Sequence, residues 1–242
     1  MRLRIVVHTR AESVPWREVL RPGRGLAYGW LTETAPDLSE RLHGAGWGPH
    51  GMVPFGYGAP RFARATRRRG SYSAGGTGAI EFGSPLPEVI EAWVRALTST
   101  RLIDWGGVAF QVDRVKFADP PDFGSGVAVW RTTTPVVMKG SGRNADGIRT
   151  TRQAHLLPAD SEFPAYFANN LRRKAESLGL DPEVSLERID WIGVKRSFAV
   201  KDGLRVGAQV GVEVRGAPET LQALWSWGLG QANSAGFGQV AA

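Results

Sequence analysis

The chain has 242 residues, of which 42% are hydrophobic and 22% charged, as in an ordinary globular protein with ample length for a core. It contains no cysteine, no apolar run near the ~18 residues of a membrane span and no two histidines spaced for one helix face. We therefore expect a cytoplasmic protein without disulfide, metal, cofactor or membrane partner, and its net charge of +7, mostly arginine, favours a partner that carries phosphates.

Hydrophobic spacing predicts alternating strands and helices in the first half. In the first strand, Leu3, Ile5 and Val7 fall on one face and basic residues on the other. Helical material is interrupted where proline and two glycines occur, at residues 21–25. The expected elements are a strand at 2–9, helical segments within 16–43, strands at 53–57 and 77–83, a helix at 86–97 and strands within 101–117. This order is the split βαβ pattern of a ferredoxin-like unit.

The second half repeats this plan without obvious sequence identity. The expected elements are a strand at 127–137, a flexible hydrophilic loop at 139–152, a helix from Ser161, strands at 189–200 and 206–214, a helix from 217–219 and a short strand at Val240. Proline, glycine and aspartate between the halves indicate a linker. We therefore predict an α+β fold of tandem ferredoxin-like halves, with domains at 1–120 and 127–242.

Basic residues gather in one stretch. Arginine occupies five of the nine positions from 61 to 69, with one phenylalanine among them. Such clusters are typical of surfaces that bind a nucleic-acid backbone, although solvated loops also carry them. Given the charge of the whole chain, we favour RNA binding. The residues predicted to bind RNA outside the glycine-rich segment are Arg64, Arg67, Arg68, Arg69, Lys195 and Arg196.

A glycine-rich frame at residues 228–238 follows an apolar stripe that predicts a helix. Loop amides with few side chains around them can hold phosphate oxygens, whereas the same glycines could simply end a helix in a tight turn. The position after a helix argues against a dinucleotide-binding fingerprint, which follows a first strand. The residues predicted to bind RNA here are Gly228, Gly230, Gly236, Phe237 and Gly238.

This frame, Gly-Leu-Gly, five residues and then Gly-Phe-Gly, closely resembles the C-terminal glycine-rich loop of Cas6, the CRISPR repeat-processing endoribonuclease of the RAMP superfamily. Other stretches resemble the family in the same order: Leu42-His43 followed by glycines and 53–57, then 134–137, then 198–201. The resemblance touches most of the chain and is most specific in the loop. It implies an RRM-like tandem scaffold and metal-independent cutting of the CRISPR repeat in precursor RNA to give crRNA.

Metal-free RNA cleavage uses the neighbouring 2′-OH as nucleophile and leaves a 2′,3′-cyclic phosphate and a 5′-OH. It needs a proton acceptor, a proton donor and positive charge for the phosphorane. Histidine suits proton transfer near neutral pH, and His43 is the first candidate. A lone histidine at a helix end more commonly pairs with a carbonyl, but the resemblance reverses that preference. Tyr28, fifteen residues earlier, resembles the tyrosine of a tyrosine–histidine pair in some family members, although it could equally be a core residue.

One departure from the family pattern concerns charge. Those members carry a lysine just after the histidine, and none occurs between His43 and Arg61. The positive charge that stabilises the phosphorane must then come from Arg41, His50, the arginine cluster or the glycine loop. We therefore include His50 with His43 and Tyr28 as catalytic candidates. The alternative is a non-catalytic crRNA-binding subunit of a CRISPR effector complex. CRISPR precursor RNA is the expected partner; other Cas proteins and a second copy of the chain stay open as partners.

Overall fold

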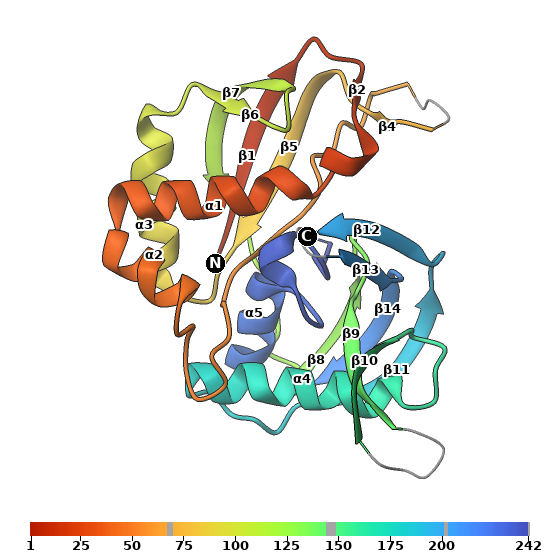
Figure 1. Cartoon of the computed structure of the whole chain (residues 1–242). Coiled ribbons are helices and arrows are strands. Elements are labelled where there is room, and N and C mark those ends of the chain that lie inside the picture. Colours follow the sequence, from red (N-terminus) through yellow and green to blue (C-terminus); the bar gives the residue numbers. More distant parts are fainter. Residues whose placement is uncertain (67–69, 144–148, 201–202, 242) are drawn as a thin grey trace.

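The computed structural model describes residues 1–66, 70–143, 149–200 and 203–241. Two main antiparallel sheets each carry helices, and the two halves of the chain lie one above the other in the view of Figure 1. Both termini lie near the middle of that view, where the halves meet. In the described part of the chain, no helix has the length and apolar character to cross a bilayer.

The first half is built on a sheet of strand order β3-β5-β1-β7-β6. Its elements are β1 (Arg2–Thr9), β2 (Ser13–Val14), the 3-10 helix η1 (Trp16–Glu18), α1 (Arg21–Thr34), α2 (Pro36–His43), β3 (Gly56–Tyr57), β4 (Tyr72–Ser73), β5 (Gly76–Gly83), α3 (Pro87–Ser99), β6 (Leu102–Asp104) and β7 (Ala109–Phe117). The central strand β1 pairs with β5 and β7, and its alternate residues Leu3, Ile5 and Val7 are fully buried. This half therefore has the predicted ferredoxin-like order.

Helix α1 corrects one prediction about this half. Residues 21–25 do not interrupt the helix, because Pro22 lies in its first turn. Backbone amides of the first turn have no carbonyl partner within the helix, so the missing amide of proline costs no hydrogen bond there. Gly23 is buried against the ring of Tyr57, where a β-carbon would collide with that ring. As a result, Arg21, Arg24 and Tyr28 occupy one face of a continuous helix at i, i+3 and i+7 spacing.

The second half contains a sheet of order β11-β14-β8 and hairpins beside it. Its elements are β8 (Val127–Arg131), β9 (Met138–Arg143), β10 (Arg149–Leu156), α4 (Phe163–Leu178), β11 (Ser185–Ile192), β12 (Arg196–Val200), β13 (Gly203–Gly207), β14 (Val210–Arg215), α5 (Pro218–Trp227) and the 3-10 helix η2 (Asn233–Ala235). A bridge between Thr132 and Val240 places the last residues beside β8, where a short final strand was predicted.

Several sequence expectations about this half differ from the structure. The strand predicted at 127–137 ends at Arg131, and the helix predicted from Ser161 begins at Phe163. Of the predicted loop 139–152, the described residues 139–143 and 149–152 belong to the paired strands β9 and β10. The predicted strand 189–200 is divided into β11 and β12, and the predicted strand 206–214 is divided between β13 and β14. The four resulting strands form two antiparallel pairs. β11 pairs with β14 in the sheet, and β12 pairs with β13 in a hairpin. Alternation of hydrophobic residues cannot reveal such a change of partner.

The buried side chain of Arg2 joins the two halves. Arg2 of β1 donates to the carbonyl of Val240 at 2.8 Å and to that of Trp225, and its guanidinium lies 4.1 Å from the Trp225 ring centroid. Glu81 is 3.7 Å from the same guanidinium. Burial lowers the pKa of Arg2 to about 9, against the opposing effect of Glu81. The amino-terminal strand and the carboxyl-terminal segment are therefore fixed to each other.

Candidate active site

A groove of about 510 Å³ lies between α1 and α2. His43 is the last residue of α2 and is exposed, whereas Leu42 beside it is buried and anchors that helix end. Tyr28 of α1 meets His43 edge to face, with 5.4 Å between ring centroids and 86° between ring planes. The predicted tyrosine–histidine pair is thus a real contact at the wall of a groove open to solvent.

The surroundings of Tyr28 shift its hydroxyl further toward the protonated form. The ring is half-buried and also packs on Phe55, and its hydroxyl is 3.5 Å from the carbonyl of Leu42. Burial raises the pKa of Tyr28, and the positive charge of Arg24 opposes the shift without cancelling it. A neutral phenol can donate a hydrogen bond to a ligand but is a poor base at neutral pH.

Two arginines that the sequence reasoning did not select line the same groove. Arg24 lies over the Tyr28 ring, with its guanidinium carbon 5.4 Å from the centroid, and Arg21 lies one turn earlier on α1. The i, i+3, i+7 spacing with Tyr28 could have identified them if the proline had been read as a first-turn residue. They place two guanidinium groups at this groove, of which that of Arg21 lies 3.3 Å from Glu18.

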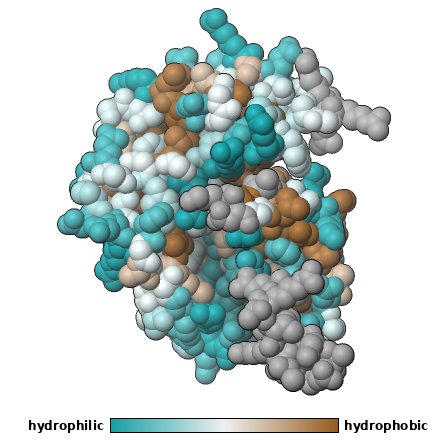
Figure 2. Space-filling view, in the orientation of Figure 1, coloured by the Kyte–Doolittle hydropathy of each residue, from teal (hydrophilic) through white to brown (hydrophobic). Residues whose placement is uncertain are grey.

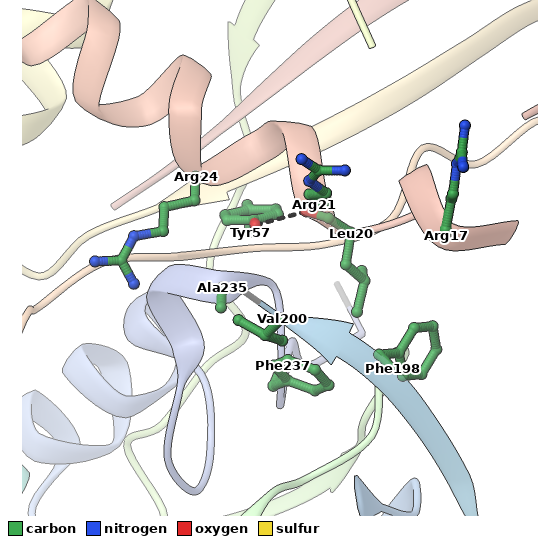
Figure 3. Close-up of a pocket in the computed structure, with 9 residues that line it drawn as sticks. All are labelled: Arg17, Leu20, Arg21, Arg24, Tyr57, Phe198, Val200, Ala235 and Phe237. Atoms are coloured by element: carbon green, nitrogen blue, oxygen red, sulfur yellow. Dashed lines mark hydrogen bonds between the residues drawn. The ribbon is translucent and has the colours of Figure 1, made fainter. Parts of the chain in front are cut away.

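The two arginines also belong to a second pocket, of about 640 Å³, that continues along α1 toward its amino-terminal end. Figure 3 shows α1 and η1 on one side of this pocket and β12 with the carboxyl-terminal turn on the other. Its apolar lining comes from both halves of the chain: Leu20, Tyr57, Phe198, Val200, Ala235 and Phe237. A single surface with Arg21 and Arg24 in its middle therefore runs from His43 to β12.

His50 lies elsewhere. Its Nε2 atom is 2.5 Å from Oε2 of Glu176 on α4, and both side chains are partly exposed. This contact ties the loop after α2 to the second half of the chain. Arg41, another candidate for the phosphorane charge, lies over Trp47 at 4.1 Å. Neither residue lines the groove that contains His43 and Tyr28.

The basic residues predicted to bind RNA are spread over the surface. Arg64 is exposed in a turn, and Arg67, Arg68 and Arg69 lie outside the described residues. Lys195 is exposed between β11 and β12. Arg196, at the start of β12, has its guanidinium 5.3 Å from the Trp16 ring centroid, which brings it to the end of the pocket that contains Phe198.

The glycine-rich segment is packed between the two halves. The amides of Gly228, Gly236 and Gly238 donate to Leu224, Asn233 and Pro135 carbonyls respectively. Gly236 and Gly238 have φ of +89° and +67°, and a β-carbon would collide with Tyr57 at the first and with the Leu229 carbonyl at the second. Phe237 is 1% exposed. RNA binding by Gly228, Gly230, Gly236, Phe237 and Gly238 stays a prediction, and the observed contacts of these residues are with the protein itself.

The buried side chain of Lys174, on α4, binds to this glycine-rich segment. Its ammonium donates to the carbonyl of Gly228 at 2.5 Å and to Oδ1 of Asn233 at 2.6 Å, and it lies over the Trp227 ring. Asn233 in turn donates to the carbonyls of Leu229 and Phe237. Burial lowers the pKa of Lys174 well below its ordinary value. Among the described residues, no group of three or more His, Cys, Asp or Glu side chains could hold a metal ion.

Comparisons with known proteins found a matching family model for the second half of the chain. Residues 118–242 match the family model described as CRISPR associated protein Cas6, C-terminal. No curated protein sequence matches the chain. A solved structure named CRISPR associated protein Cas6 is 22% identical, with a TM-score of 0.77 over 100% of this chain and 98% of that one.

Two further solved structures share the fold. One is described as a RAMP protein binding different RNA substrates and is 16% identical, with a TM-score of 0.80 over 99% of this chain and 98% of that one. The other is a Cas6 product complex, 18% identical, with a TM-score of 0.67 over 100% and 98% of the two chains. The likenesses confirm the predicted α+β fold of tandem ferredoxin-like halves.

Proposed function

Because the chain belongs to the Cas6 family of CRISPR-associated proteins, we propose that it is an endoribonuclease that cuts CRISPR repeat RNA in precursor transcripts to give crRNA. One observation carries the proposal: His43 and Tyr28 are in contact at the wall of an open groove that Arg21 and Arg24 also line. One structural neighbour is described as a RAMP protein binding different RNA substrates and another as a Cas6 product complex, which supports RNA as the ligand of this chain.

We assign proton transfer to His43. The neighbouring 2′-OH of the RNA attacks the phosphorus, the bond to the 5′ oxygen breaks, and the products are a 2′,3′-cyclic phosphate and a 5′-OH. The imidazole of His43 is exposed, and an imidazole can act as a general acid or a general base. Tyr28 acts as a neutral donor, because burial keeps its hydroxyl protonated, and it holds the position of the imidazole through their ring contact.

The arginines of α1 stabilise the charge that builds up on the phosphate. A guanidinium can donate two hydrogen bonds to one phosphate, and donors that are already in place lower the barrier without reorganisation. Arg24 is oriented by its contact with Tyr28, so that its charge stays beside the proposed reacting groups. No step in this scheme needs a metal ion.

The test is an assay of labelled CRISPR repeat RNA in excess EDTA. A discrete product with a cyclic phosphate end supports the proposal. Binding that leaves the RNA intact would instead assign the protein to the non-catalytic subunits of an effector complex. Absence of any salt-dependent RNA affinity would exclude both functions, because phosphate contacts always release counterions.

A further inference from the structure

A ladder of aromatic rings connects the surface of the β12–β13 hairpin with the core. Trp16 of η1 stacks on Phe198 of β12, with 5.6 Å between centroids and 22° between planes. Phe198 meets the buried Phe237 edge to face at 5.8 Å. Arg196 lies over the outer Trp16, which is 40% exposed despite these contacts. The exposed ring of this set is Trp16, whereas Phe198 is half-buried and Phe237 is buried.

Two rings of this ladder, Phe198 and Phe237, line the 640 Å³ pocket beside the proposed active site. Figure 2 shows hydrophobic surface gathered over the β12–β13 hairpin, next to hydrophilic surface of the first half. In Figure 3, Leu20 extends from the start of α1 toward Val200 and Phe198 on the opposite side. Arg17, Arg21 and Arg24 supply the cationic rim. Arg17 and Arg21 form ion pairs with Glu18, at 3.4 and 3.3 Å. An apolar floor beside these arginines and Arg24 fits a ligand that has a flat apolar part attached to an anion.

The pocket is continuous with the groove that contains His43. Arg21 and Arg24 line both, and Arg21 precedes Tyr28 by seven residues on one helix. At the rise of an α-helix this separation is about 10 Å along the axis. Stacked nucleotides of one strand rise about 3.4 Å each, so the distance corresponds to roughly three nucleotides.

We infer that this pocket binds one unpaired nucleobase of the RNA, stacked on Phe198, a few nucleotides from the cut phosphate. The inference rests on the proposed function and adds to it that the bound RNA is single-stranded next to the cut. A paired base cannot enter, because both of its faces are occupied by its neighbours in the helix, whereas an unpaired base offers a free face for stacking on an aromatic ring. The adjoining phosphates meet the arginine rim.

The experiment uses the full chain and CRISPR repeat RNA in which 2-aminopurine replaces one nucleotide at a time. Stacking quenches 2-aminopurine, so we expect binding to quench the fluorescence at one position near the cut. Phe198→Ala should restore the fluorescence there and weaken RNA binding about 5- to 100-fold. An abasic nucleotide at that position should weaken binding to the wild type by a similar factor and have no further effect on Phe198→Ala.

Two further variants control for loss of the fold and for nonspecific effects of removing an aromatic ring. Phe198→Leu keeps the apolar volume and therefore the fold, but removes the stacking surface, so it should also restore the fluorescence. Phe117→Ala removes another exposed ring, on β7, and should leave both binding and quenching unchanged. Quenching at no position, or quenching that persists in both Phe198 variants, would overturn the inference. If the RNA is still cut in that case, the proposed function stands and only the base pocket is wrong.

Discussion

Tyr28 and His43 are in ring contact, although they come from different helices and are separated by a helix end and a proline. The contact depends on Leu42, which is buried and fixes the last turn of α2 against the core. It also depends on Phe55, which packs against the other side of Tyr28. The pair is therefore held by the core of the first half, while the imidazole itself faces solvent.

Replacement of Tyr28 by phenylalanine keeps the ring contact and removes the donor. We expect Tyr28→Phe to lower the cleavage rate by about 10- to 100-fold with little change in RNA affinity. Burial raises the pKa of Tyr28 above its ordinary value of 10.0, so the wild-type advantage should be lost at a higher pH than that of an ordinary tyrosine. Rate profiles of both proteins against pH check this. An advantage that disappears below pH 10 would mean that the hydroxyl does not act as a donor.

The guanidinium of Arg24 combines charge with a fixed orientation over Tyr28. We expect Arg24→Ala to slow cleavage about 10- to 100-fold and to reduce the slope of log affinity against log salt by about 1, the effect of one lost phosphate contact. Arg24→Lys should restore the slope but not the full rate, because an ammonium cannot donate in two places to one phosphate. Arg101→Ala, an exposed arginine before β6, is the matched control, and an equal loss there would exclude a local role.

Arg2 tests the contact between the halves. Its guanidinium is fully buried among the carbonyls of Val240 and Trp225, the Trp225 ring and Glu81. Arg2→Met leaves those acceptors and the carboxylate without their partner, and we expect a loss of about 3–5 kcal/mol in the free energy of unfolding. Denaturant unfolding measures it. Arg114→Met, on the exposed part of β7, should change the value by less than about 0.5 kcal/mol, and similar losses in the two variants would refute the assignment.

The burial of Lys174 predicts that the free energy of unfolding changes with pH in a defined direction. Burial lowers its pKa in the folded protein well below 10.5, the ordinary value for a lysine. Between the two pKa values the unfolded chain binds more protons, so the free energy of unfolding rises with pH over that window. We expect the stability of the wild type relative to Lys174→Met to increase from neutral pH toward pH 10.5. A relative stability that falls over this range would contradict the assignment.

The sequence predicted the architecture because its main signals are local. Alternation along β1, the helical stripes and the linker residues are each readable within a short window, and together they imply the ferredoxin-like order. The errors arose where a pattern has two structural readings. Pro22 could break a helix or begin one, and alternating residues in 189–200 could belong to one strand or to two.

The candidate site was only partly predictable. His43 and Tyr28 were selected through a family resemblance, since nothing in their spacing alone reveals a contact across two helices. Arg21 and Arg24 were missed because their helix was assumed to begin later. The pocket wall formed by Phe198 could not be foreseen, because it depends on how β12 of one half lies against α1 of the other.

The measurement that tests the account most directly is cleavage of CRISPR repeat RNA in EDTA by the wild type and by His43→Ala, with affinity measured in parallel. We predict that the wild type gives a discrete product and that His43→Ala is slower by about 10²- to 10⁴-fold with nearly unchanged affinity. His8→Ala, an exposed histidine on β1, serves as the matched control and should cut at the wild-type rate. An equal cleavage rate in wild type and His43→Ala would contradict the account.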